Sequence, residues 1–479
     1  MDSHFRSAAD IAAAVRSGET SPTAVVEEFC DRIEARNDVT NAFVTVLSAD
    51  ARSRAREIEH RLESGEDLPL AGVPVAMKDL SETKAGVRNT MGLEVLSENV
   101  AESTSVTIRR LEDAGAIVVG TTNTPELGHR VRTDNLLQGP TSTPFDTTRN
   151  AGGSSGGSAA ALADGLCAVA TGSDVGGSLR NPAACCGVVS VKPSHGLIPR
   201  GNHVNGFRGH TPVGVLGPMA RDVESLAVAL DVLAGPDPID PFSVPKPATY
   251  RTAIEGAPDT AALSVAYTPD LGMFAVDPAV RTAIESTLSA LEDAGATVED
   301  VSLDPPEKDG LAQAYLTAVT TYFATAVAEI DESLEIDLLA DHDEGIPGEL
   351  RSLVSIGEHN DITEYARSDF PRTELYHAVE TALSGYDALA CPTLATPPLT
   401  HDEPFPTTID GEPTNGLPTD WTLAWPFNLT GHPVVNVPAD TADGLPVGMQ
   451  LVGRTYDEST LLDVARAIES VSPWTYPNA

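Results

Sequence analysis

Residues 151–165 read AGGSSGGSAAALADG. Four glycines and three serines fill the seven positions from 152 to 158, and an alanine-rich run follows. Apolar segments with regular periodicity adjoin the stretch on both sides, which argues against a flexible linker between modules. A P-loop would carry lysine where this chain has Ser158, and the dinucleotide-binding spacing G-x-G-x-x-G is absent. The stretch therefore predicts a turn whose glycines serve backbone geometry inside a folded core.

The same stretch fits the G-x-S-x-G pattern of a nucleophile elbow, which raises the question of whether one of its serines reacts. An elbow needs a strand directly before it, but residues 140–153 read as a loop. Its serine would also need a downstream histidine, and no histidine of this chain lies in a sequence motif that would indicate such a role. The candidates are His195, His210 and His432. The sequence therefore disfavours an elbow.

Lys78 is unusual for its surroundings. It lies near the end of the apolar run LPLAGVPVAMKDL (68–80), which predicts a buried strand, in a chain with only five lysines. Burial disfavours the ammonium form and lowers the pKa of a lysine, which suits it to act as a base. A structural alternative stays open, in which Lys78 reaches the surface or pairs with Asp79.

A second serine lies in TGSDVGGS (171–178), which follows an apolar strand predicted over 167–170. Glycines allow a tight turn and leave their N–H groups uncovered. Successive free N–H groups beside a hydroxyl are what an oxyanion hole requires. Ser178 is therefore a candidate nucleophile, with the N–H groups of residues 175 to 178 as donors. A plain glycine turn before the next buried strand, 188–191, is the alternative.

The rest of the chain predicts an α/β fold with a largely buried sheet. Ser21 and Pro22 begin a helix, helix and strand alternate over 103–120, and the joint LEDAGA recurs at 291–296. Several further segments are assigned by pattern. They are a proline-rich surface crossing at 235–250, an acidic helical face at 329–349, a long loop at 400–420, a strand at 444–453 and a closing helix at 457–471.

The charge, the cysteines and the lack of long apolar runs exclude several classes of function. The 479 residues carry a formal net charge of −40, which disfavours direct binding of nucleic acid or anionic lipid and indicates adaptation to high salt. Five cysteines without zinc-like spacing predict neither a metal site nor a disulfide framework. No leader-like start or apolar run of about 18 residues is present, so we expect a cytoplasmic protein without a membrane span.

These motifs together resemble the amidase signature family. The resemblance is carried by residues 152–192 and by flanking segments that include GVPVAMKDL (72–80), DAGAIVVGTTN (113–123), FNLTGHPVVNVPAD (427–440) and GLPVGMQLVG (444–453). It implies one α/β domain with a mixed central sheet surrounded by helices. Within it we expect N-terminal helices at 1–65, the signature core at 66–230, a variable helical region at 231–400, and a C-terminal strand and helix at 401–479 that return to the core.

The resemblance also implies a Ser-cisSer-Lys triad. Ser178 is the acyl-forming nucleophile, Ser154 the bridging serine after a cis peptide bond, and Lys78 the base. The other implied site residues are Val175, Gly176 and Gly177 of the oxyanion hole and, around them, Ser155, Ser173, Asp174 and Arg180. The family often has threonine at position 173 and lysine at 121, where this chain has serine and threonine. No metal or organic cofactor is implied.

The activity implied is hydrolysis of a small carboxamide to a carboxylic acid and ammonia or an amine. The alternative within the family is the A subunit of the tRNA-dependent glutamine amidotransferase, which releases ammonia from glutamine for a partner subunit. That protein usually carries Met-Asp-Glu-Phe where residues 124–127 read TPEL. A non-catalytic binding module would predict a broken triad, whereas all three members are present. We expect segments 122–130 and 310–380 and the loop before Trp421 and Trp425 to line the substrate pocket, and we leave open whether the chain forms a homodimer.

Overall fold

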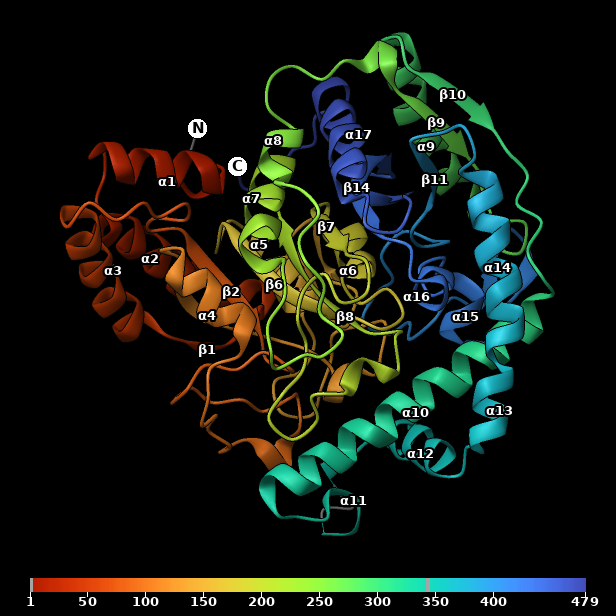
Figure 1. Ribbon diagram of the computed structural model, residues 1–479, viewed down its shortest axis with the longest axis horizontal. Coiled ribbons are helices and arrows are strands. Elements are labelled where there is room, and N and C mark those ends of the chain that lie inside the picture. Colours follow the sequence, from red (N-terminus) through yellow and green to blue (C-terminus); the bar gives the residue numbers. More distant parts are fainter. Residues whose placement is uncertain (1–2, 342–344) are drawn as a thin grey trace.

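The computed structural model describes residues 3–341 and 345–479 (Figure 1). Its main sheet has eleven strands. They are β1 (Phe43–Val46), β2 (Pro74–Lys78), β3 (Ile117–Thr122), β6 (Val169–Asp174), β7 (Val189–Lys192), β8 (Val215–Ala220), β9 (Ser264–Tyr267), β10 (Thr297–Asp300), β11 (Ala388–Pro392), β14 (Val434–Ala442) and β15 (Leu445–Val452). Their order is β1-β3-β2-β6-β8-β7-β14-β15-β11-β9-β10. The sheet contains both parallel pairs, such as β2–β3, and antiparallel pairs, such as β6–β8, so the predicted mixed α/β sheet is confirmed.

The helices surround this sheet. They are α1 (Ala8–Ser17), α2 (Pro22–Thr40), α3 (Ser48–Glu63), α4 (Val106–Asp113), α5 (Gly156–Ala163), α6 (Arg180–Cys186), α7 (Val223–Leu233), α8 (Tyr250–Ala253), α9 (Pro278–Asp293), α10 (Lys308–Leu334), α11 (Leu338–Asp341), α12 (Gly348–Glu358), α13 (Ile362–Arg367), α14 (Asp369–Ala382), α15 (Pro418–Trp421), α16 (Pro426–Thr430) and α17 (Glu458–Val471). In Figure 1, α1 to α3 lie at one end and α10 to α14 follow the lower and right margins. Among the helices that the structure describes, none is both long and apolar enough to span a bilayer.

The register of β2, β3 and β6 fixes where the site lies. β2 runs parallel to both neighbours, with Val75 opposite Val169 and Pro74 opposite Ile117. All residues of β2 and β6 are buried, as expected for strands covered on both faces. Because parallel strands end at one edge, Lys78 comes level with the end of β6, next to Ser173. Ligand sites of open α/β sheets lie at this carboxyl edge.

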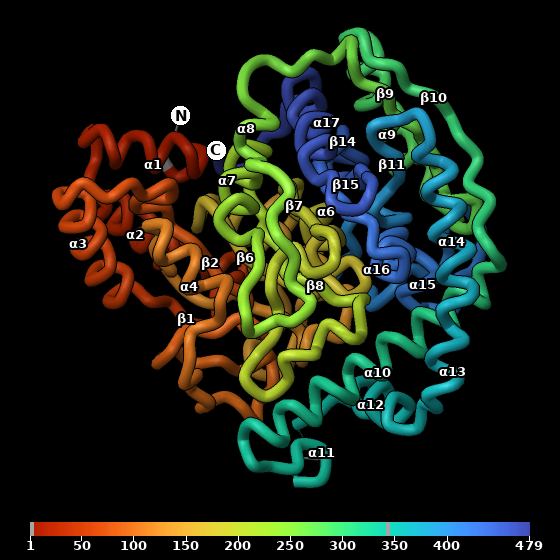
Figure 2. The backbone as a smooth tube through the Cα atoms, in the orientation of Figure 1, coloured from red at the N-terminus to blue at the C-terminus, as the bar shows by residue number. Residues whose placement is uncertain are grey.

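A second apolar cluster lies outside the main core. Side chains of α10 and α12 pack there against Leu93, Leu96 and Leu127, which belong to the segments that follow β2 and β3. Figure 2 shows α10 crossing the lower part of the molecule with α12 beside it. This cluster joins the helical region to the segment after β3.

Most predicted elements are confirmed at nearly the expected positions. Ser21 caps α2, its Oγ accepting the Ala24 N–H, and the strands and helix predicted over 68–80, 444–453 and 457–471 are β2, β15 and α17. Residues 235–250 form an irregular crossing. The strand expected at 167–170 lies later, at Val169–Asp174. Of the acidic stretch 329–349, residues up to Leu334 continue α10, while 342–344 lie outside the described residues.

Two loops contain more structure than expected. Residues 140–153 contain the hairpin β4 (Ser142–Thr143) and β5 (Asp146–Asn150), and residues 400–420 contain the short pair β12 (Thr408–Ile409) and β13 (Glu412–Pro413). Neither pair shows an alternating apolar pattern, so the sequence carries no strand signal there. The β4–β5 pair is a separate sheet, and β5 does not place the glycine-rich turn at the end of a central strand.

Candidate active site

Lys78 is fully buried at the end of β2, with 1% of its surface exposed. Its Nζ donates to Ser154 Oγ at 2.7 Å and to Ser173 Oγ at 3.1 Å. The neighbouring Asp79 carboxylate is bound instead by Thr90 and Asn89. The structural alternative, in which Lys78 reaches the surface or pairs with Asp79, is therefore wrong.

The surroundings of Lys78 favour the neutral amine. Burial lowers the pKa of Lys78 to about 7, although Glu82 and Asp174 act in the opposite direction. A lysine with this pKa is partly neutral near neutral pH, and a neutral amine can accept a proton from the hydroxyl that it contacts.

Ser154 lies in a tightly held turn between β5 and α5. The Gly153–Ser154 peptide bond is cis, and the Ser154 side chain is buried. Asn150 Oδ1 accepts the Gly152 N–H, and Thr133 Oγ1 donates to the Gly152 carbonyl and accepts the Gly156 N–H. A Cβ on Gly153 would lie 2.7 Å from the backbone of Arg132, so this position requires glycine.

Ser178 lies beside this turn, just before α6. Its carbonyl accepts the Ser155 N–H at 3.1 Å, and its side chain is partly accessible to solvent, unlike that of Ser154. Within the described part of the chain, the Ser154 and Ser178 hydroxyls form no hydrogen bond with each other. The structure thus joins Lys78 to Ser154 directly and places Ser178, which is partly exposed, against the same turn.

The predicted oxyanion loop is only partly available. The Gly177 N–H donates to Asp174 Oδ1 at 2.8 Å in this structure, and the expectation that it binds an oxyanion stays a prediction. The N–H groups of residues 175, 176 and 178 donate to no acceptor among the described hydrogen bonds. Three donors of the four expected therefore have no acceptor within the described contacts.

Asp174 and Arg180 form a fully buried ion pair behind this loop. Arg180 Nη2 and Nε contact the two Asp174 oxygens at 2.9 and 3.0 Å. Arg180 also donates to Gln450 Oε1 and Asn428 Oδ1, each at 2.7 Å. Burial raises the pKa of Asp174, but Arg180 and the hydrogen bonds outweigh it and hold this pKa well below its usual range. The pair fixes the shape of the loop that carries Ser178.

None of the histidine candidates is bonded to either serine within the described contacts. His432 contacts Glu380 and Thr430, while His195 and His210 pack on Phe242. Burial lowers the pKa of His195 and of His432 to about 4. Among the described side chains, no group of three or more histidine, cysteine, aspartate or glutamate residues is arranged to hold a metal ion.

Known proteins match this chain over nearly its whole length. The family model Amidase matches residues 24–462. An acylamidase from Rhodococcus erythropolis is 34% identical over 475 residues, covering 98% of this chain and 96% of that protein. The A subunit of glutamyl-tRNA(Gln) amidotransferase from Geobacillus stearothermophilus is 35% identical, covering 95% of each. A solved bacterial aryl acylamidase superposes with a TM-score of 0.91 at 32% identity, covering 98% of this chain and 97% of that chain.

This chain belongs to the Amidase family. The amidase is accordingly a hydrolase that acts on amide bonds, and the predicted family, single-domain fold and enzyme class are confirmed.

Aromatic side chains border the loop of residues 175–178 in the amidase. Tyr315 of α10 and Trp425 have ring centroids 5.3 Å apart, and Phe274 lies 6.3 Å from Trp425. A Cβ on Gly176 would meet the Tyr315 hydroxyl, and one on Gly177 would meet Ala424. Part of the expected pocket lining, from the 310–380 region and from the loop around Trp425, therefore lies at the predicted site.

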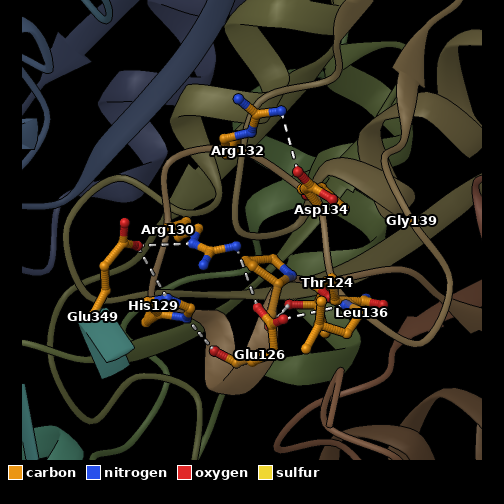
Figure 3. Close-up of polar contacts among 12 residues, drawn as sticks. Thr124, Glu126, His129, Arg130, Arg132, Asp134, Leu136, Gly139 and Glu349 are labelled. Atoms are coloured by element: carbon orange, nitrogen blue, oxygen red, sulfur yellow. Dashed lines mark hydrogen bonds and ion pairs between the residues drawn. The ribbon is translucent and has the colours of Figure 1, made fainter. Parts of the chain in front are cut away.

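The segment after β3 also adjoins the site of the amidase. A Cβ on Gly128 would lie 3.0 Å from Ser154 Oγ. Figure 3 shows Glu349 of α12 reaching His129 and Arg130, while Arg130 also faces Glu126. The contacts with His129 and Arg130 outweigh partial burial and lower the pKa of Glu349 to about 2. The segment that adjoins Ser154 is thus linked to the helical region.

Sequence reasoning missed three residues of this neighbourhood, Glu82, Asn428 and Gln450, while Tyr315 lies within the 310–380 segment that is expected at the pocket but is not singled out there. Asn428 and Gln450 stand in segments that carry the family resemblance, FNLTGHP and GMQLVG, and this signal could have marked them. Glu82 and Tyr315 have no comparable signal, because their place depends on how distant segments pack.

Proposed function

We propose that this amidase cleaves its substrate through Ser178, Ser154 and Lys78. The observation that carries the proposal is the 2.7 Å contact between Lys78 Nζ and Ser154 Oγ in a buried cis turn that adjoins Ser178. Neutral Lys78 takes the Ser154 proton as Ser154 takes the Ser178 proton. Ser178 Oγ then attacks the amide carbonyl, and the oxyanion is bound by the N–H groups of residues 175, 176 and 178.

The second half of the reaction reverses the proton movement. As the tetrahedral intermediate collapses, the C–N bond breaks and the proton held by Lys78 returns through Ser154 to the leaving nitrogen. An acyl ester on Ser178 remains. A water molecule then loses a proton to the same relay and attacks the ester, which releases the carboxylic acid and restores the Ser178 hydroxyl.

The substrate we propose is an N-acyl amide with an aromatic group. The names of two relatives, acylamidase and aryl acylamidase, support this class. Tyr315, which meets Gly176 and is partly exposed, provides a ring on which a flat group would pack, and the buried rings of Trp425 and Phe274 support it from behind.

The second candidate is the glutamine-hydrolysing component of a tRNA-dependent amidotransferase, which the 35% identity to such a protein supports. This function would require recognition of glutamine and a partner subunit. The TPEL run at 124–127 departs from the usual run of that component. The free amidase is therefore the function that we propose first.

The test is ammonia or aniline release from acetanilide, benzamide and glutamine, with fluorophosphonate labelling of the intact protein followed by peptide mass spectrometry. We expect label on Ser178 and fastest turnover of the anilide. Label on another residue would overturn the assignment of the nucleophile. Glutamine as the preferred substrate, together with co-purification of a second protein chain, would favour the amidotransferase.

We also propose that the protein works in a salt-rich cytoplasm. The net charge of −40 supports salt adaptation, since screening relieves self-repulsion. The five cysteines are buried and unpaired, as is usual in a reducing compartment. The free energy of unfolding should fall as salt is lowered from molar to millimolar, and an unchanged value would contradict this proposal.

A further inference from the structure

Glu82 is a buried carboxyl that the mechanism proposed above does not use. Only 2% of its surface is exposed. Within the described residues its Oε2 has no hydrogen-bond partner, and neither has the Oγ1 of the adjacent Thr171. A buried carboxyl without full compensation is costly, so its place near the site calls for an explanation.

The backbone brings Glu82 to the face of β6 that holds Lys78. The chain turns sharply after β2, where the Leu80 N–H donates to the Lys78 carbonyl at 2.8 Å. Glu82 then comes to face the hydroxyls of Thr171 and Thr107. Residues two apart on a strand share a face, so Thr171 and Ser173 lie on the same face of β6. Ser173 Oγ accepts a hydrogen bond from Lys78 Nζ.

Of the two carboxyl groups that influence the charge of Lys78, only that of Glu82 lacks an ion-pair partner within the described contacts. Lys78 donates to two neutral hydroxyls and to no carboxylate within the described contacts. Asp174 is already neutralised by its two contacts with Arg180. Glu82 has no ion-pair partner in the described part of the chain either, so two buried groups that can carry opposite charge lie four residues apart in the chain, each without an ion pair.

We propose that Glu82 is a positioning residue that sets how much of Lys78 is present as the neutral base. As a carboxylate it stabilises the Lys78 ammonium, and as a neutral acid it leaves Lys78 free to accept a proton from Ser154. This inference rests on the proposed function of Lys78. No bond is made or broken by Glu82.

Titration of the two groups supports this coupling. Burial raises the pKa of Glu82 to about 7, while the hydroxyls of Thr171 and Thr107 and the charge of Lys78 oppose that rise. Burial lowers the pKa of Lys78 to about 7, and the charge of Glu82 opposes that fall more than Asp174 does. Both groups therefore change charge in the same pH range.

The experiment measures the rate of fluorophosphonate labelling at Ser178 against pH, because this needs no knowledge of the natural substrate. In the wild-type protein the rate should rise as Lys78 loses its proton. Glu82→Gln removes the carboxylate that stabilises the ammonium, so the pKa of Lys78 falls and the rising limb should move to lower pH by about one unit. Glu458→Gln is the matched control, since Glu458 is also buried and binds the Ser194 N–H instead. In this variant the labelling rate should rise over the same pH range as in the wild-type protein.

The outcomes separate this inference from the proposed function. A Glu82→Gln limb that coincides with the wild-type limb, with only a lower plateau, would show a structural role alone and overturn the inference. Absence of pH-dependent labelling at Ser178 in the wild-type protein would instead overturn the proposed function.

A second measurement covers the case in which Glu82→Gln does not fold. The chain has only five lysines, so ¹³C-lysine NMR of the wild-type protein can follow the Lys78 side chain, assigned with Lys78→Arg. Coupling predicts a broadened titration that spreads over more than one step. A sharp single-step titration would contradict the inference.

Discussion

The site core and the cap of this amidase are held together by different interactions. The site core comprises Lys78 with residues 150–158 and 171–180, and the cap comprises α10, α11 and α12. In the site core, hydroxyls, amides and one buried ion pair fix the backbone. The cap packs mainly through an apolar cluster, and ion pairs tie it to the rest of the chain, among them Arg130–Glu349, which is partly exposed, and Arg208–Glu329, which is mostly buried.

Because of this difference, the site core and the cap should tolerate amino-acid substitutions to different degrees. A buried polar network is costly when one member is lost, because the remaining groups stay desolvated and unpaired. An apolar cluster tolerates changes of similar volume at small cost. The cap also brings Tyr315 to Gly176, so variation in the cap can alter the substrate while the site core keeps the chemistry.

The largest effect should follow the loss of the Ser178 hydroxyl. Ser178→Ala removes the proposed nucleophile, so kcat should fall by about a million-fold, as for other enzymes that lose a serine nucleophile. The unfolding transition should stay within about 0.5 kcal/mol of wild type, since the side chain is partly exposed and the Ser155 N–H bond uses the backbone. Residual turnover near the wild-type rate would show that the chemistry lies elsewhere.

Arg180→Met should cost the most stability. It leaves the Asp174 carboxylate buried without its counter-charge, which for broken buried pairs costs about 3–5 kcal/mol. Urea unfolding measures this loss, and kcat should fall as well because Asp174 holds the Gly177 and Leu179 N–H groups. Arg281→Met is the matched control, because the Arg281–Asp410 pair is partly exposed and should contribute less than about 1 kcal/mol. Equal losses in both variants would refute the distinction drawn for the site core.

The contrast also explains what could be predicted from the sequence. The apolar run leaves open whether Lys78 is buried or reaches the surface, whereas its proximity to Ser154 is implied by the family resemblance. The Asp174 bond to Gly177 depends on a backbone turn that four residues of sequence do not define. The partners of Arg180 come from positions near 430 and 450, so only the sheet topology brings them together. Glu82 stands in a polar run, DLSETK, that reads as a surface turn, although packing buries it.

In the cap, removal of a core side chain should loosen the helices without destroying the chemistry. Leu350 is fully buried in the cluster that also holds Leu127. Leu350→Ala should cost about 2–5 kcal/mol of local stability, and KM should rise more than kcat falls. Hydrogen exchange of α10 and α12 together with steady-state kinetics measures both. Ile356→Ala, on the exposed side of α12 at 46% exposure, should stay within about 0.5 kcal/mol. Collapse of kcat in Leu350→Ala would place the cap within the chemistry.

The smallest effect should come from the ion pair that links the cap to residues 129 and 130. The Glu349 side chain is 72% exposed, so Glu349→Gln should cost no more than about 1 kcal/mol at low salt, because water screens the pair. The cost should vanish in molar salt, where the screening length is about 3 Å. Glu358→Gln, on the same helix and without an ion pair in the described contacts, controls for the change in net charge. A larger loss that persists in molar salt would mean that this pair holds the cap as firmly as Asp174 and Arg180 hold the site core.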